Sequence, residues 1–129
     1  MEDDEQTSGS AEALLEEGIN LFNAGHYHDA HDSWEEVWLA SRATDGDFFK
    51  GLIQAAICLH HFERANLRGT RKLYVGHRRY LAEYSPAHKG VDVSRLLADM
   101  ESFVGPVLEA EEGAAVPWRA ESSPKIRRA

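Results

Sequence analysis

The chain has 129 residues, and 43% of them are hydrophobic, which is enough to bury the core of one domain. It carries 22 acidic and 14 basic residues, and its net charge of −8 at pH 7 argues against a general attraction to nucleic acid or to an anionic membrane. The single cysteine excludes an internal disulfide bond and a four-cysteine zinc site.

Two helices are predicted in the first third of the chain, after an acidic and polar segment, residues 1–9, that we expect to be disordered. The first helix runs from Ala11 to Asn23, where apolar residues recur at helical spacing, and Gly25 is expected to end it. The second runs from His26 to Ala40. Because the link around Gly25 is short, the two helices should pack as antiparallel neighbours.

The most hydrophobic stretch, Phe48 to Asn66, is predicted to be a central buried helix. Its apolar residues leave no wide polar face, which is typical of a helix surrounded by protein. Asp45 or Asp47 can cap its start with a side-chain oxygen. Its uncharged part, Gly51 to Phe62, is shorter than the ~20 apolar residues that a bilayer requires, so it should not span a membrane.

Two further helices are predicted after a turn at Gly69. The fourth helix runs from Thr70 to Tyr84 and ends before Pro86, and the fifth runs to Ala110 with Asp92 as its cap. Pro106 is expected to kink or end the fifth helix early. One face of the fourth helix is mainly apolar and contains Leu73, Tyr74, His77, Leu81 and Tyr84.

Together these elements predict an all-α fold, a compact bundle of about five helices around the buried central helix at residues 48–66. Residues 10–110 would form a single helical domain, and the Gly-, Ala-, Ser- and Pro-rich residues 111–129 a flexible C-terminal tail. An acid-rich, lysine-poor surface suits high salt and suggests a halophilic source. The residues after Met1 are acidic, so we expect no signal peptide and a cytoplasmic protein.

Four polar residues on the second and central helices are the candidate functional residues. His31 and Glu35 lie one turn apart, where an imidazole and a carboxylate can bind one metal ion or act as a base with its orienting partner. Gln54 and His61 share one face of the central helix, so the four could form a polar pocket between the helices. Inward carboxylates are too few for a di-iron site, which leaves at most one divalent metal ion with three candidate ligands, His31, Glu35 and His61.

The same four residues can instead hydrogen-bond one another as a buried network that fixes helix register without chemistry. His60 and His61 point about 100° apart on a helix, so both cannot easily serve one site, and His60 is expected at another interface or at the surface. The remaining histidines are expected to be mostly solvated: His26, His28, His77 and His88.

A basic run forms a second candidate site on the fourth helix and the turn before it. It could hold a phosphate or an acidic partner. The alternative is a solvated face that balances the acidic surface, and we favour this interpretation. The run consists of Arg64, Arg68, Arg71, Lys72, Arg78 and Arg79.

Three stretches resemble the family called domain of unknown function 309, small all-helical proteins of bacteria and archaea. They are LFNAGHYHDAHDSWEEVW (21–38), FFKGLIQAAICLHH (48–61) and ANLRG (65–69). The usual proline before the central helix is missing around Thr44. The resemblance implies a helical bundle without an established activity. The residues that match the family pattern are His31, Glu35, Glu36, Trp38, Gly51, Leu52, Ile53, Gln54, His61, Asn66 and Gly69.

Three functions stay open, and the sequence does not decide whether the protein is an enzyme. The first is a non-enzymatic structural or interaction module with a buried His/Glu/Gln network, whose partner is another protein or a second copy. The second is a hydrolase-like, metal-dependent enzyme that uses His31, Glu35 and His61, with Gln54 and Asn66 orienting substrate. The third is a phosphate or nucleic-acid binder through the Arg64–Arg79 face.

Overall fold

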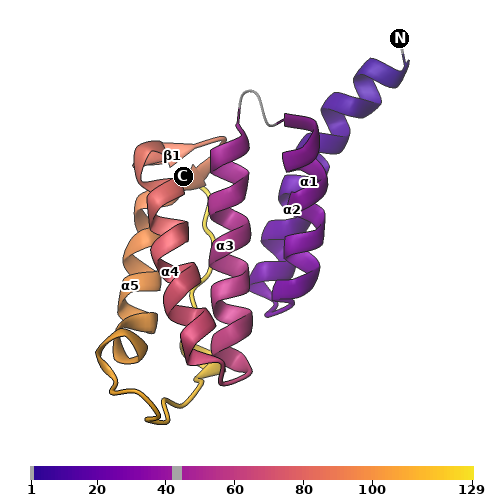
Figure 1. Cartoon of the computed structure of the whole chain (residues 1–129). Helices are drawn as coiled ribbons and strands as arrows, with labels where there is room; N and C mark the ends of the chain where they lie inside the picture. The colour runs from indigo at the N-terminus through magenta and orange to yellow at the C-terminus, as the bar shows by residue number, and fades with distance from the viewer. Residues whose placement is uncertain (1, 42–44) are drawn as a thin grey trace.

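The computed structural model describes residues 2–41 and 45–129, and their side chains from Ala11 to Ala40 and from Asp45 onward. Within these ranges the chain forms five α-helices and a small antiparallel hairpin, which confirms the predicted all-α fold (Figure 1). The helices are α1 (Glu2–Asn23), α2 (Tyr27–Ser41), α3 (Gly46–Glu63), α4 (Leu67–Leu81) and α5 (Val93–Glu109). The hairpin strands are β1 (Ala87–His88) and β2 (Val91–Asp92), and two single 3₁₀ turns cover Ala82–Tyr84 and Ala120–Ser122.

Helices α1 and α2 form the predicted antiparallel pair. Gly25 has a φ of +87°, the left-handed conformation that glycine adopts without strain. The amide of His26 donates to Leu21 O at 2.8 Å and that of Gly25 to Phe22 O at 3.0 Å, the paired bonds that close a helix C-terminus. The helix itself begins at Glu2, so residues 2–9, expected to be disordered, form its first turns.

The α1–α2 interface is built on close contact between a glycine and a tryptophan. A Cβ placed on Gly18 would lie 2.1 Å from Trp34 Nε1, so only glycine lets the indole pack directly against the α1 backbone. The Trp34 indole is fully buried and donates to Leu15 O at 3.3 Å. This contact fixes α2, and with it the polar residues on its outer face, against α1.

Helix α3 lies between α2 and α4, as predicted for a central helix (Figure 1). Asp45 stands at its N-cap position, but its side chain makes no capping bond and accepts instead from His88 Nε2 at 2.9 Å. Helices α4 and α5 do have side-chain caps, Asn66 Oδ1 for Gly69 N at 3.1 Å and Asp92 Oδ1 for Arg95 N at 3.0 Å. Thr44, where the family proline is missing, lies outside the described residues.

Helix α5 does not end at Pro106, which was one of the two expected effects of this proline. It continues for three more residues to Glu109. After it, the chain does not leave the bundle as a flexible tail. Ile126 is buried, and the Trp118 ring packs edge-on against the rings of Phe62 and Phe103. These contacts are made by extended chain, which has no helical period, and the sequence pattern therefore gave no sign of them.

No helix in the described part of the chain is both long and apolar enough to cross a membrane.

Candidate functional site

The four residues predicted from the sequence fall into two separate pairs. His31 and Glu35 lie together on α2, with His31 Nε2 3.3 Å from Glu35 Oε2. Gln54 and His61 instead face α4. A Cβ placed on Gly76 would lie 1.7 Å from Gln54 Oε1, and one on Gly69 would lie 2.8 Å from the His61 ring.

Among the described side chains, no hydrogen bond or ion pair joins the α2 pair to Gln54 or His61. His61 Nδ1 bonds instead to Asn66 Nδ2 at 3.1 Å. The side chain of Glu35 is 51% exposed to solvent, so it is not part of a buried network. The expected four-residue pocket is not formed, because Gln54 and His61 lie on the α4 side of α3.

Cys58 lies between Gln54 and His61 on this same side of α3. Its thiol is buried and donates to Thr70 O at 3.3 Å. Burial raises the pKa of Cys58 to about 12, so the reactive thiolate is scarcely populated at neutral pH. Cys58 therefore serves to pack α3 against α4.

A different cluster surrounds His31 on the outer face of α2. His28, His31 and Asp32 occupy positions i, i+3 and i+4, so their side chains gather on one side of the helix. One ligand atom from each, an imidazole nitrogen or a carboxylate oxygen, lies within 4.8 Å of the other two. His28 was not among the residues predicted for the site, and it is exposed, as expected. The HDAHD spacing was the signal that could have placed it with His31 and Asp32.

The two nitrogens of His31 have different surroundings. Nε2 lies next to the Glu35 carboxylate, whereas Nδ1 is buried and has no hydrogen-bond partner among the described residues. Asp32 Oδ1 lies 3.9 Å from this Nδ1, too far for a hydrogen bond. In the tautomer that donates from Nε2 to Glu35, the lone pair of His31 is on Nδ1, on the side of the Asp32 carboxylate, where a cation can be held.

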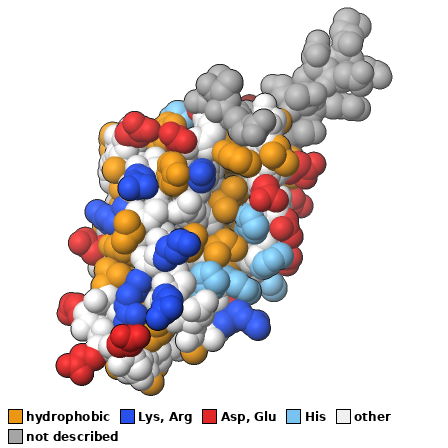
Figure 2. Space-filling model, viewed as in Figure 1, with side chains coloured by type: hydrophobic (Ala, Val, Ile, Leu, Met, Phe, Trp, Pro, Cys, Tyr) orange, Lys and Arg blue, Asp and Glu red, His pale blue; other side chains and the backbone are white. Residues whose placement is uncertain are grey.

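His60 brings α3 to the edge of this cluster. Its ring centroid lies 5.7 Å from that of His28 and 6.2 Å from that of His61. Burial lowers the pKa of His60, and the nearby Arg64, His28 and His61 lower it further, so the ring is neutral at neutral pH. Figure 2 shows histidine side chains gathered on this face of the molecule. The structure thus places His60, rather than His61, toward α2.

The predicted basic run is partly used inside the protein. Arg71 donates to Val107 O and Ala110 O, and Arg78 donates to Leu97 O at 3.3 Å. The Arg71 bonds satisfy carbonyl groups at the C-terminal end of α5, which have no partner within that helix. These two arginines hold α4 against α5, so they are not free to form a phosphate-binding face.

His77 is the histidine whose environment differs most from the expectation. It is fully buried, and its Nδ1 lies 2.5 Å from Tyr74 O, whereas solvent exposure was expected. Burial lowers the pKa of His77 to about 4. Its Nε2 has no hydrogen-bond partner among the described residues. Among the described side chains, its ring contact is with Tyr74 and not with another histidine, and we assign it to the core rather than to the site.

Comparisons with known proteins found one family model and one curated relative that match part of the chain. The model of a family described as a domain of unknown function (DUF309) matches residues 15–73, which confirms the predicted resemblance over that part of the chain and includes the α2 cluster. An uncharacterized protein of Aquifex aeolicus (strain VF5) is 29% identical over 93 residues, which cover 71% of this chain and 28% of that protein. The chain thus matches little more than a quarter of that relative. No solved structure matches the chain.

Proposed function

We propose that the protein binds one divalent transition-metal ion through His28, His31 and Asp32. The observation that carries this proposal is the buried Nδ1 of His31, which faces the Asp32 carboxylate without a hydrogen-bond partner among the described residues. A lone pair and a carboxylate repel each other unless a proton or a metal cation lies between them. A metal ion there satisfies both groups, and the charge of Asp32 partly neutralises it.

The donor set indicates which ions fit. Two imidazole nitrogens and one carboxylate oxygen suit Zn²⁺ and similar transition metals, whereas Ca²⁺ and Mg²⁺ prefer oxygen ligands alone. Tetrahedral zinc with bonds of about 2.1 Å needs its ligand atoms about 3.4 Å apart. The present atoms lie within 4.8 Å, and rotation of the exposed His28 side chain can supply the remaining approach.

Glu35 has a supporting role in this account and is not a ligand. A metal-bound histidine usually donates its other N–H to a carboxylate, which fixes the tautomer and makes the ligand more basic. Glu35 Oε2 is placed to accept from His31 Nε2 in this way. The ligand set thus replaces the one expected from the sequence, since His28 and Asp32 take the places of Glu35 and His61.

Three protein ligands leave at least one coordination position for water or a substrate, as in catalytic zinc sites. A water bound there would ionise near neutral pH, which keeps the hydrolase-like alternative open with the new ligand set. The neutral His60 ring next to His28 is the group on α3 best placed to contact a molecule bound at that position.

Calorimetric titration of chelator-treated protein with Zn²⁺ tests the proposal. We expect one ion per chain, and at least a 100-fold weaker affinity in each of His28→Ala, His31→Ala and Asp32→Asn. His26→Ala and Asp29→Asn are matched controls, because both residues are exposed and neither belongs to the cluster. The proposal is wrong if the protein does not bind zinc, or if the cluster variants bind it as tightly as the controls.

A further inference from the structure

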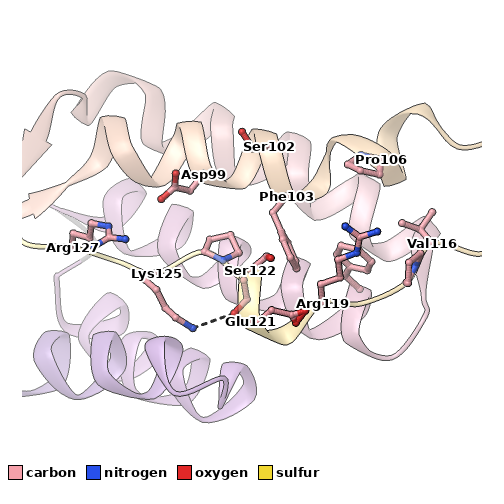
Figure 3. Close-up of a pocket in the computed structure, with 14 residues that line it drawn as sticks. Asp99, Ser102, Phe103, Pro106, Val116, Arg119, Glu121, Ser122, Lys125 and Arg127 are labelled. Atoms are coloured by element: carbon pink, nitrogen blue, oxygen red, sulfur yellow. Dashed lines mark hydrogen bonds between the residues drawn. The ribbon is translucent and has the colours of Figure 1, made fainter.

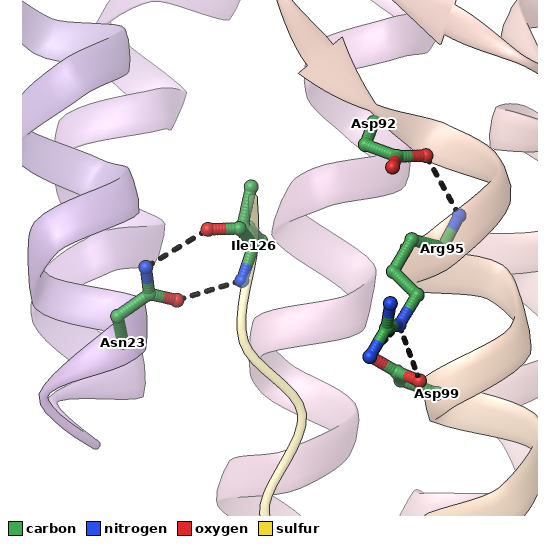
Figure 4. Close-up of polar contacts among 5 residues, drawn as sticks. All are labelled: Asn23, Asp92, Arg95, Asp99 and Ile126. Carbon is green, nitrogen blue, oxygen red and sulfur yellow. Dashed lines mark hydrogen bonds and ion pairs between the residues drawn. The ribbon is translucent and has the colours of Figure 1, made fainter. Parts of the chain in front are cut away.

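The last residues of the chain, 116–129, form a docked strap that is bound largely through its backbone. The side chain of Asn23 on α1 forms hydrogen bonds with both the backbone N–H and the backbone C=O of Ile126 (Figure 4). Asn23 Nδ2 donates to Ile126 O at 2.9 Å, and Asn23 Oδ1 accepts from Ile126 N at 2.7 Å. An amide side chain used in this way makes the two hydrogen bonds that a neighbouring β-strand would make. It therefore recognises the backbone of the strap rather than one of its side chains.

The strap also pairs with the hairpin. Asp92 N donates to Arg127 O at 2.9 Å, Ala129 N donates to Gly90 O at 2.9 Å, and Val91 and Arg128 form an antiparallel bridge. The end of the chain therefore extends the edge of β2, which is the way in which many domains bind an extended peptide.

Two apolar anchors complete the docking. The Trp118 ring lies 5.9, 5.3 and 5.1 Å from the rings of Tyr27, Phe62 and Phe103, and Ile126 is only 3% exposed. Arg128 adds an ion pair with Glu16 on α1. The strap is thus held against α1, α2, α3 and α5, and Ser123 and Pro124 between the two anchors are buried as well.

Between Trp118 and Ile126, the strap and α5 do not pack directly against each other. A groove of about 640 Å³ lies between them, with Asp99 and Phe103 on the α5 side and Lys125 and Arg127 on the strap side (Figure 3). The connection from α5 is also open to solvent, because residues 111–115 are all exposed and Gly113 has a φ of +86°. The connection lies outside the helices, so the strap can leave its site without unwinding α5, and its departure uncovers the apolar surface that Trp118 and Ile126 cover.

We propose that two copies of the protein exchange their straps, so that residues 116–129 of each dock on Asn23 and β2 of the other. Every contact described above forms equally well with a strap from a second copy, which is the condition for exchange of identical elements. Charge favours docking of the strap in both arrangements. The strap has four basic residues and one acidic residue, whereas the whole chain carries a net charge of −8, so the body is acidic and attracts a strap from either source.

Exchange competes with docking within one chain, which has an effective concentration in the millimolar range for a short linker. The dimer should therefore grow with protein concentration. Light scattering after size exclusion should show a mass rising from 14.5 kDa toward twice that value as the loaded concentration approaches about 1 mM. The Trp118→Ala/Ile126→Asp variant should stay at the monomer mass. A wild-type monomer at every concentration would overturn the proposal.

A cysteine experiment shows whether a dimer uses the strap. In a Cys58→Ala background, Asn23→Cys and Ile126→Cys are made in separate chains, mixed at high concentration and mildly oxidised. We expect a disulfide-linked heterodimer well above that formed when Lys72→Cys, on the exposed side of α4, replaces Asn23→Cys. A heterodimer yield no higher than that control, in a sample that light scattering shows to be dimeric, would assign the dimer to another surface and contradict the exchange.

Discussion

His31 lies between two carboxylates, with Nε2 3.3 Å from Glu35 Oε2 and Nδ1 3.9 Å from Asp32 Oδ1. The first distance allows a hydrogen bond and the second does not. The imidazole is therefore held by one acidic group and directs an unpaired nitrogen toward the other. This asymmetry distinguishes the α2 cluster from the solvated histidine and carboxylate pairs that are common on helix surfaces.

Removal of the Glu35 carboxylate should weaken metal binding without abolishing it. Glu35→Gln keeps the size of the side chain but not its charge, and loss of a supporting carboxylate typically costs 10- to 100-fold in metal affinity. We expect a loss in that range for Zn²⁺, measured by competition with a chelator of known affinity. Glu36→Gln is the control, because this neighbouring exposed acid does not contact His31. Equal affinities in both variants would remove Glu35 from the site.

Substitution of His61 should leave zinc affinity within about twofold of the wild type. His61 faces α4 and bonds to Asn66, so His61→Ala should instead lower the free energy of unfolding by about 1 kcal/mol through the lost hydrogen bond. Urea unfolding and zinc titration of the same sample separate the two effects. If the variant lost zinc and kept its stability, the ligand set inferred from the sequence would be restored.

Close packing of α1 on α2 predicts a large difference between two glycine-to-alanine variants. A Cβ on Gly18 would overlap the buried Trp34 ring, and overpacking of this kind typically costs about 1–3 kcal/mol. A Cβ on Gly105 meets nothing within 4 Å, so Gly105→Ala should be neutral or stabilise α5 by about 0.5–1 kcal/mol. Thermal unfolding of both variants measures the contrast. Similar melting temperatures would mean that the helices are not packed as described.

The buried His77 predicts a pH-dependent loss of stability. Burial lowers its pKa from 6.5 to about 4, so the unfolded chain binds the proton more readily than the folded protein does. Stability is then unaffected above about pH 6.5, falls as the pH is lowered, and levels off near pH 4, with a total loss of about 3 kcal/mol.

The His77→Leu variant isolates this contribution from that of the carboxylates, which titrate over part of the same range. Urea unfolding between pH 7 and pH 4 should show a smaller loss of stability in the variant than in the wild type. Parallel curves for the two proteins would show that His77 is not held neutral by burial.

The helices could be predicted from the sequence because each carries its own apolar period and turn residues. The side of α3 on which a given polar residue lies could not be predicted from the sequence. His60 and His61 differ by one position, and their roles depend on which neighbouring helix packs on which side of α3. His28, His31 and Asp32 all lie on α2, so their grouping depends only on helical spacing and could have been predicted from the sequence.

Two other features lay beyond the sequence pattern for physical reasons. Trp118 and Ile126 are anchors on extended chain, and their burial depends on a groove that distant helices build. His77 shares a face of α4 with apolar residues, but it was grouped with the histidines expected near termini, loops or outer faces and so to be mostly solvated. In the fold, Tyr74, His77 and Leu81 on that face are buried, whereas Leu73 and Tyr84 stay partly exposed.

The most direct test of the proposed metal site is two-dimensional ¹H–¹⁵N NMR of the histidine rings during a Zn²⁺ titration. We expect His31 to carry its proton on Nε2 before zinc is added. Its Nδ1 signal and one ring nitrogen of His28 should then shift together and saturate at one equivalent, while the signals of His61 and His26 stay in place. If His61 responds and His28 does not, or if no histidine responds, His28, His31 and Asp32 do not bind zinc.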